Sequence, residues 1–366
     1  FCFPVPFKVV FRHASASRSK AENIIVKIRS DTGLAGFGEG CPRDYVTGET
    51  IQTAVRFIEQ HKASLTRDVT TVAALRAWVD AHQPEIDKNP AAFCAVELAI
   101  LDLLGKTAGA PVEAIIGVPQ MAATFDYSAI LGDAPYAVYW WQFQRYWHAG
   151  FRDFKVKISG KTGRDQRKIG IFRRRTDPLL RVRLDANNLW STAEHCIAHI
   201  NRLSYPVFAI EEPLRANDIA GFRSVAVECK TRIILDESFL RREQLDVLTD
   251  PDKWLINVRV SKMGGLLRAI DIVNGATRRG IGVIVGAQVG ETSILTRAAL
   301  IVATTAGDRL AAQEGAFGTR LLQEDLTIPS LMFGDGGTLV PLRIMDSEAP
   351  GLGLEIKEGL LSRPAL

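Results

Sequence analysis

Cysteine is scarce in this chain, and the few cysteines form no recognisable motif. Five cysteines occur among 366 residues, an odd number, widely scattered and never spaced as CxxC. This pattern argues against a disulfide framework and against a structural zinc site. It favours a reducing compartment, so we expect a cytoplasmic protein. The cysteines are Cys2, Cys41, Cys94, Cys196 and Cys229.

Long apolar runs and a strong excess of one charge are also missing. A membrane-spanning helix would need a run of about 18 apolar residues, and the opening FCFPVPFKVVF lacks the pattern of a secretory signal. The 45 basic and 41 acidic residues are interspersed and leave a net charge of only +4. We therefore expect no nucleic-acid partner and no membrane partner. With 47% hydrophobic residues, the chain can bury a sizeable core in more than one domain.

The first 110 residues are typical of a small α+β domain. Residues 22–40 alternate apolar and polar side chains around a Thr-Gly turn, which predicts a β-hairpin in an antiparallel sheet. Three segments with helical periodicity follow, and we expect them to pack on that sheet. These segments are residues 51–65, 72–81 and 91–107.

From residue 111 the pattern changes to short β-branched or apolar runs, each followed by an amphipathic stretch. Their spacing of roughly 25 residues is the length of one βα unit, and eight such units are what a barrel of parallel strands requires. A doubly wound open sheet is the alternative, but YSAILGDAP lacks its glycine-rich phosphate turn. The runs are YSAIL, FKVKI, RVRLDAN, PVFAIEE, RIILDES, WLINVRVSK, GIGVIVGAQ and LAAQEG.

The end of the chain does not continue the βα pattern. The stretches DGGTLVPL and EAPGLGLEI are typical of strands and loops, and we expect them to fold back onto the N-terminal sheet. The smaller domain is therefore predicted to comprise residues 1–110, completed by about 322–366. The barrel is predicted to span residues 111–321.

A carboxylate ends each of three successive runs, at Asp185, Glu211 and Asp236. In a barrel the carboxyl ends of neighbouring strands meet on one rim. Three carboxylates in such a place repel one another unless a hard cation lies among them. All-oxygen ligation suits Mg²⁺, with Mn²⁺ as an alternative, better than zinc. An acid at a strand end is often only the N-cap of the next helix, but three in consecutive units favour a metal site.

Lys155 and Lys157 lie two residues apart in FKVKI, so their side chains leave the same face of the strand. In a barrel that face is the interior, where burial and like charge both disfavour the ammonium form and produce a usable base. An exposed edge strand that displays two lysines is the alternative. Beside a metal that stabilises the enolate of a carboxylate substrate, we predict that Lys157 removes the α-proton.

Taken in order, these motifs resemble the enolase superfamily, and within it the muconate-lactonizing-enzyme subgroup, over nearly the whole chain. The resemblance implies an α+β capping domain on a modified TIM barrel of the (β/α)7β type. It implies Asp185, Glu211 and Asp236 as metal ligands, and Lys155 and Lys157 as the catalytic KxK pair. The matching motifs are FKVKI, RLDAN, IEEPL, LDES, SKMGGL and EAPGLGLEI.

The segment CPRDYVTGET, residues 41–50, is similar to the capping-domain loop that shapes substrate choice in this subgroup, most of all in its dipeptide epimerases. Those epimerases carry Asp-x-Asp after the last barrel strand, where this chain has Ala316 and Gly318. The loop FRHASASR around His13 is a second candidate to cover the site. We expect a small carboxylate substrate. Its predicted contacts are Arg43, Tyr45, Thr47, Asn187, Gln288 and Glu291.

Arg259 is the main departure from the subgroup. It occupies the position of the second catalytic lysine in INVRVSKMGGL, and Lys262 matches the other, non-catalytic lysine. Arginine keeps its proton at any ordinary pH, so Arg259 can stabilise negative charge but cannot readily exchange protons. A two-base epimerase needs proton exchange on both faces of the substrate.

We therefore predict a one-base cycloisomerase or lyase that resembles muconate cycloisomerase, with Lys155, Lys157 and Arg259 as its catalytic residues. The first alternative is a dipeptide or amino-acid epimerase. The second, from another class, is a catalytically silent binding protein. Barrel enzymes of this type often assemble, so a homo-oligomer is a candidate state.

Overall fold

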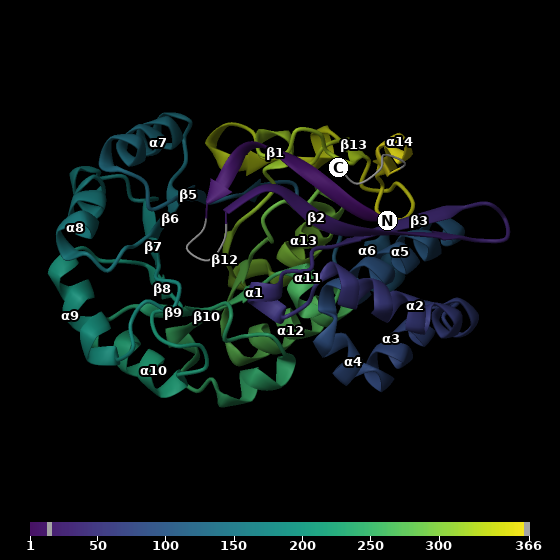
Figure 1. Ribbon diagram of the computed structural model, residues 1–366, viewed down its shortest axis with the longest axis horizontal. Helices are drawn as coiled ribbons and strands as arrows, with labels where there is room; N and C mark the ends of the chain where they lie inside the picture. Colours follow the sequence, from purple (N-terminus) through teal and green to yellow (C-terminus); the bar gives the residue numbers. More distant parts are fainter. Residues whose placement is uncertain (13–16, 362–366) are drawn as a thin grey trace.

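The computed structural model describes residues 1–12 and 17–361 (Figure 1). An antiparallel sheet opens the chain, and its second and third strands pair from Ile24 with Gly40 to Arg29 with Ala35. This pair is the predicted hairpin, which is confirmed. The three strands are β1 (Cys2–Arg12), β2 (Ser17–Arg29) and β3 (Ala35–Gly40).

Helices pack on this sheet, and the three predicted helical segments are confirmed. The long helix α5 lies directly against β3, because Gly36, Gly38 and Gly40 carry no side chain on the contacting face. A Cβ at Gly38 would meet the Ala95 carbonyl oxygen at 2.1 Å. The helices are α1 (Asp44–Thr47), α2 (Ile51–Asp68), α3 (Val72–Ala81), α4 (Gln83–Lys88), α5 (Pro90–Ala108) and α6 (Val112–Ile116).

Eight parallel strands then follow in chain order in one curled sheet, as the βα spacing predicts. The ends of the ladder approach each other, since the amide of Ser128 donates to the carbonyl of Gln313 at 2.8 Å. An enolase-type modified barrel is therefore confirmed over the doubly wound alternative. The strands are β5 (Ala129–Leu131), β6 (Asp153–Lys157), β7 (Arg181–Asp185), β8 (Ala209–Glu211), β9 (Arg232–Leu235), β10 (Trp254–Val258), β11 (Gly282–Val285) and β12 (Leu310–Gln313).

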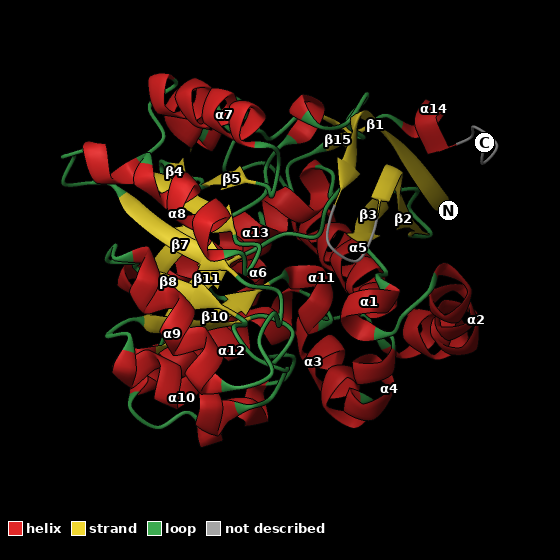
Figure 2. Cartoon of the chain, turned by 60° about the vertical axis from the view of Figure 1, so that its left-hand side comes forward, coloured by secondary structure: helices red, strands yellow, loops and turns green. Residues whose placement is uncertain are grey.

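Figure 2 shows helices covering the outer face of this curled sheet. Its interior contains a small apolar cluster supplied by the last five strands, and this cluster forms a base for the polar residues of the rim. The cluster comprises Ala209, Ile234, Leu255, Ile284 and Ala312. The outer helices are α7 (Tyr136–His148), α8 (Thr162–Gly170), α9 (Ala193–Leu203), α10 (Ile219–Glu228), α12 (Leu266–Arg279) and α13 (Ser293–Ala306), whereas the short helix α11 (Val260–Met263) packs against α5.

After β12 the chain returns to the N-terminal sheet. The amide of Lys8 donates to Leu321 at 2.8 Å, and that of Gln323 donates to Pro6 at 2.9 Å. Short strand pairs complete this part: β13 (Thr327–Ile328) with β15 (Glu355–Ile356), and β14 (Thr338–Leu339) with β4 (Phe125–Asp126). The last described element is α14 (Glu358–Leu361). The residue bounds of the two domains stay a prediction.

Two carboxylates from the N-terminal region reach the amino ends of barrel helices. Glu39 accepts the amides of Thr292, at 2.9 Å, and Leu295, at 3.2 Å, at the start of α13. Glu97 accepts the amides of Leu266 and Leu267 at the start of α12. Helix amino ends carry unpaired N–H groups and partial positive charge, so these acids join the two parts of the fold.

The five cysteines are all free, in agreement with the sequence pattern. Within the described ranges, no helix combines the length and apolar character that crossing a membrane would require.

Candidate active site

The ends of β6, β7 and β8 lie in register. Lys157 pairs with Asp185, and Asp185 pairs with Glu211, so three predicted site residues stand side by side on one rim. Asp236 follows β9 directly on the same rim. Asp185, Glu211 and Asp236 are each only 2% exposed. The structure therefore gathers the three carboxylates from separate strands, as the barrel geometry predicts.

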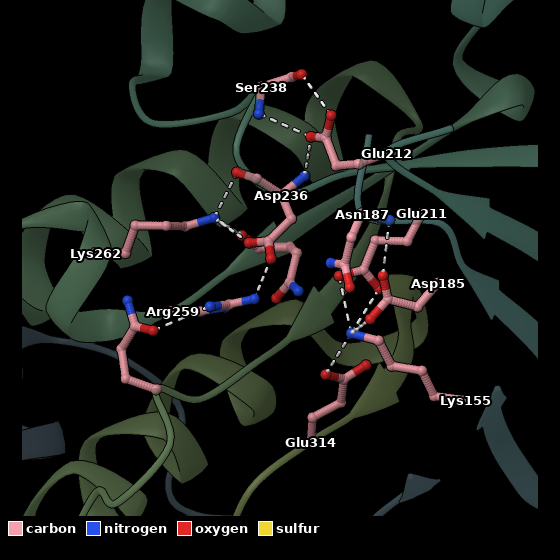
Figure 3. Close-up of polar contacts among 12 residues, drawn as sticks. Lys155, Asp185, Asn187, Glu211, Glu212, Asp236, Ser238, Arg259, Lys262 and Glu314 are labelled. Carbon is pink, nitrogen blue, oxygen red and sulfur yellow. Dashed lines mark hydrogen bonds and ion pairs between the residues drawn. The ribbon is translucent and has the colours of Figure 1, made fainter. Parts of the chain in front are cut away.

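Lys155 lies at the centre of one half of the site (Figure 3). Its Nζ is 2.7 Å from Glu211 Oε2, 3.1 Å from Glu314 Oε2 and 3.6 Å from Asp185 Oδ2. Burial lowers the pKa of Lys155, but the carboxylates of Glu211, Glu314 and Asp185 outweigh burial and raise it above its usual range. Lys155 therefore remains an ammonium ion and supplies fixed positive charge.

Lys157 has fewer partners than its neighbour. Its Nζ lies 3.1 Å from Asp185 Oδ2 and donates to Asn187 Oδ1 at 2.9 Å, and its side chain keeps 15% exposure. Lys155, by comparison, keeps 6%. Of the two lysines, Lys157 is thus nearer the open end of the barrel. The role of Lys157 as the base stays a prediction.

Asp236 occupies the other half of the site, between two cations. Lys262 donates to Asp236 Oδ1 at 2.7 Å and also to the backbone carbonyls of Asp236 and Asn257, so its ammonium group is held behind the rim. Arg259 donates to Asp236 Oδ2 and, at 3.0 Å, to Gln288 Oε1. Burial raises the pKa of Asp236, but these cations outweigh it and hold the pKa well below its usual range.

Arg259 keeps its charge in this setting. Burial lowers its pKa, but Asp236 and Glu237 outweigh burial and raise the pKa above the usual range. Gln288, which accepts from Arg259, also donates its backbone amide to Glu291 at 2.6 Å. Burial raises the pKa of Glu291 to about 8. The structure therefore links Arg259, Gln288 and Glu291 in one chain of hydrogen bonds.

The three residues predicted from the substrate loop, Arg43, Tyr45 and Thr47, differ from one another in burial. The guanidinium of Arg43 is buried and donates to the carbonyls of Glu22, Pro42 and Val289 and to the Asn23 side chain. These contacts tie the loop to β2 and to the segment after β11. Tyr45 is 39% exposed and Thr47 is half-buried, both on the short helix α1. Their contact with substrate stays a prediction, and His13 lies outside the described residues.

Three charged residues of the site, Arg183, Glu212 and Glu314, were missed in the sequence. Arg183 is fully buried and donates to Glu314 at 2.9 Å and to Asp153 at 3.0 Å. Glu212 accepts the amide and hydroxyl of Ser238 and the amide of Asp236 at 2.7 to 2.8 Å, which fixes the loop after β9. Period-two spacing was the available signal for Arg183, because it precedes Asp185 as Lys155 precedes Lys157.

The carboxylates are suited in kind to a hard divalent cation, since they offer only oxygen. Burial raises the pKa of Glu211 well above its usual value, Lys155 opposes this, and Asp185 adds to it. Glu211 Oε2 is buried and lies 2.7 Å from the Lys155 ammonium, an ion pair that a metal ligand would have to share or give up. In the described part of the chain, no three His, Cys, Asp or Glu side chains are already arranged as a metal cage. The ammonium of Lys155 and the guanidinium of Arg259 lie against the carboxylates instead.

Known protein families match both parts of the chain. Residues 2–117 match the model described as "Mandelate racemase / muconate lactonizing enzyme, N-terminal domain", and residues 141–360 match "Enolase C-terminal domain-like". The chain belongs to the mandelate racemase/muconate lactonizing enzyme family of the enolase superfamily. It falls in the muconate-lactonizing-enzyme subgroup, as its motifs indicate. It is therefore an enolase-superfamily enzyme, and a silent binding protein is not supported.

Its relatives in this family include racemases and epimerases. The N-succinyl-L-Arg/Lys racemase of Bacillus cereus is 27% identical over 379 residues, which cover 99% of this chain and 95% of the relative. The L-Ala-D/L-Glu epimerase of Bacillus subtilis is 28% identical over 305 residues, 82% of each protein. The structure of its substrate-liganded complex gives a TM-score of 0.82 at 25% identity, over 97% of this chain and 96% of that one.

A third relative was crystallised with a metal. The dipeptide epimerase of Methylococcus capsulatus, complexed with Mg and the dipeptide L-Arg-D-Lys, gives a TM-score of 0.77 at 25% identity and covers 96% of each chain. These comparisons support the epimerase alternative better than the cycloisomerase or lyase that the sequence pattern favoured. The prediction gave most weight to one position, Arg259, whereas the comparisons weigh the whole chain.

Proposed function

We propose that this enzyme is a Mg²⁺-dependent isomerase that removes the α-proton of an amino-acid-like or dipeptide-like carboxylate. The observation that carries the proposal is the in-register rim of Lys157, Asp185 and Glu211, with the lysine amine 3.1 Å from the nearest carboxylate. The substrate class is supported by the relatives, whose names specify N-succinyl amino acids and dipeptides. Mn²⁺ is an alternative ion for the same oxygen donors.

The metal would be held by three carboxylates, those of Asp185, Glu211 and Asp236. Arg259 would keep its contact with Asp236 and also face the bound substrate. A bound divalent cation would stabilise negative charge that develops on a substrate carboxylate. The chain's own residues supply the rest. Lys157, in its neutral form, takes the α-proton, and Asn187 orients its amine. Lys155 adds a fixed positive charge below the reacting group, where it needs no reorganisation.

Epimerisation also needs a proton delivered to the opposite face. The relatives favour epimerisation, but Arg259 stands where a second lysine was expected, and its raised pKa excludes it as a base at neutral pH. If Lys157 is the sole proton-transfer group, the enolate must present both faces to it. Recovered substrate should then gain deuterium faster than it inverts.

A one-base cycloisomerase or lyase is the second candidate, and Arg259 is the specific observation that favours it. In such an enzyme the guanidinium would stabilise negative charge on a departing or attacking group without exchanging a proton. Exchange would be confined to one face of the α-carbon. No inverted product would form.

One experiment in D₂O distinguishes the epimerase from the one-base cycloisomerase or lyase. The enzyme is incubated with Mg²⁺ and a panel of dipeptides, N-succinyl amino acids, free amino acids and carboxylates without nitrogen. NMR then measures α-deuterium, and chiral chromatography measures inversion. We expect exchange with at least one amino-acid derivative, lost on addition of a chelator and in Lys157→Ala. Exchange that persists in Lys157→Ala would refute the assignment of the base, and exchange without inversion would favour the second candidate.

A further inference from the structure

A buried ion pair lies directly behind the strand end that carries Lys157. Asp165 and Lys168 both belong to α8, the helix that follows this strand, and their relative exposures are 0% and 1%. Their side chains are 3.3 Å apart. A buried pair of this kind is costly to desolvate, so it is expected to have partners that use both charges.

Both members of the pair bind the turn that begins at Lys157, one at the Lys157 carbonyl and the other at Ser159. Lys168 Nζ donates to the carbonyl of Lys157 at 2.8 Å. Asp165 accepts the amide of Ser159 at 3.0 Å and its hydroxyl at 2.9 Å. Because Ile158 N donates to the carbonyl of Asp185, the segment is also tied to the next strand. The turn that carries the base is therefore fixed from two directions.

The pair is itself anchored from neighbouring elements. Lys168 also contacts Asp133, in the loop after β5, at 2.5 Å. His199 of α9 reaches Asp165 through Nε2 at 3.2 Å. Burial raises the pKa of Asp165, but hydrogen bonds from His199 and Ser159 outweigh it and hold the pKa below its ordinary value. Asp165 is thus a charged acceptor, as strong backbone hydrogen bonds require.

We propose that Asp165 and Lys168 are positioning residues that hold the β6 end, and with it Lys157, in the geometry needed for proton abstraction. The inference rests on the proposed function in one respect, that Lys157 is the base. Neither residue touches the reacting atoms. They act by fixing the backbone from which the base extends, since a shift of about 1 Å in a reacting group can cost roughly 10²-fold in rate.

The test compares variants of one helix. The double variant Asp165→Asn/Lys168→Met removes both charges together, so no unpaired buried charge is left to unfold the protein. The kcat for α-proton exchange should fall roughly 10- to 100-fold, as when partners that orient an active-site ligand are removed. The KM and the Mg²⁺ affinity should stay unchanged. Arg167→Met removes one positive charge from the exposed face of α8, as Lys168→Met does from the buried face, and should keep the wild-type rate. Lys168→Arg retains a donor and should recover most of the activity.

A crystal structure of the double variant gives a readout independent of activity. We expect the Lys157 amine to have left its positions 3.1 Å from Asp185 and 2.9 Å from Asn187. An unchanged Lys157, or an exchange rate no lower than that of Arg167→Met, would overturn the proposal. If the wild-type enzyme exchanges the α-proton of no acid at all, the proposed function fails. The positioning role is then tested by the crystal structure alone, from whether the Lys157 amine moves in the double variant.

Discussion

The two halves of the rim place positive charge beside carboxylates in different ways. At the ends of β6 to β8, the cations are lysines, and the Lys157 amine contacts Asp185 and Asn187 within the described residues. At the ends of β9 and β10, Asp236 is held between Arg259 and Lys262 (Figure 3). The first half places a lysine amine at the open end of the barrel, whereas the second places there the guanidinium of Arg259, which keeps its proton, and holds Lys262 behind the rim. The difference suggests a site built to move protons on one side and to hold charge on the other.

The largest effect should follow from removing the proton-transfer group of the first half. In Lys157→Met, α-exchange should fall by about 10²- to 10⁴-fold, the range that a positioned acid or base contributes. NMR in D₂O at saturating Mg²⁺ and substrate measures the rate. Lys161→Met removes an exposed lysine of the following loop and should leave the rate unchanged. A comparable loss in both variants would contradict the special role of Lys157.

The second half can be converted to resemble the first. Arg259→Lys restores an amine that can exchange protons, so the ratio of inversion to exchange should rise by about 10-fold or more. Chiral chromatography combined with mass spectrometry of recovered substrate measures this ratio. Arg259→Met removes the charge without adding a base, and should raise neither inversion nor exchange. If Arg259→Lys behaves like Arg259→Met, the asymmetry of the rim does not decide the stereochemistry.

A smaller effect is expected from changing Glu314, which contacts two cations of the first half of the rim. Glu314 holds both Lys155 and Arg183, at 3.1 and 2.9 Å. In Glu314→Gln the charge that fixes Lys155 is lost, and kcat should fall by roughly 10-fold, within the range for removing a supporting partner. Steady-state kinetics measure the change, with the exposed Glu324→Gln as control. A rise in KM alone would indicate that Glu314 serves binding and not positioning.

The smallest effect concerns pH and the anchoring of the second half. Burial raises the pKa of Glu97 to about 8, although the amides of Leu266 and Leu267 oppose this. Between its ordinary pKa near 4.5 and about 8, folded Glu97 keeps a proton that the unfolded chain has lost. The contribution of Glu97 to the free energy of unfolding should therefore decrease as pH rises through this window, by at most about 1.4 kcal/mol per pH unit.

Glu97→Gln should flatten this dependence, because an amide does not titrate. Denaturant unfolding at pH 5.5, 6.5 and 7.5 measures it. Glu85→Gln alters an exposed acid of the same domain and should retain the slope. A slope that is the same in Glu97→Gln and the wild type would show that Glu97 is ionised throughout the range.

The sequence predicted the part of the site that depends on strand order. Asp185, Glu211 and Lys157 could be placed together because parallel strands in a barrel end on one rim. Arg183 and Glu314 could not be recognised as easily, since a charged residue within a short strand usually faces water. Only closure of the sheet turns their face inward, and closure involves the contact of Ser128, just before β5, with Gln313 of β12, far apart in sequence.

The helix partners of Glu39 and Glu97 escaped prediction for a related reason. An acid that accepts amides from its own helix is signalled by local spacing, but these acids serve helices that start long after them in the chain. Neither hydrophobic periodicity nor helix propensity indicates a contact between residues so far apart in the sequence. The hairpin and the three helical segments of the same region, by contrast, depend on local periodicity and were predicted.

Those two acids also restrict how the enzyme can admit its substrate. Glu39 and Glu97 bind the starts of α13 and α12 at separate points, so the N-terminal region cannot rotate on the barrel without uncapping two helices. Exposing such N–H groups in a buried interface is unfavourable. We therefore expect access to depend on small loop movements, and we propose as the gate residues 44–48, which follow the anchored Arg43. Substrate preference in this enzyme should accordingly change with the length and composition of that loop, while the domain arrangement stays fixed.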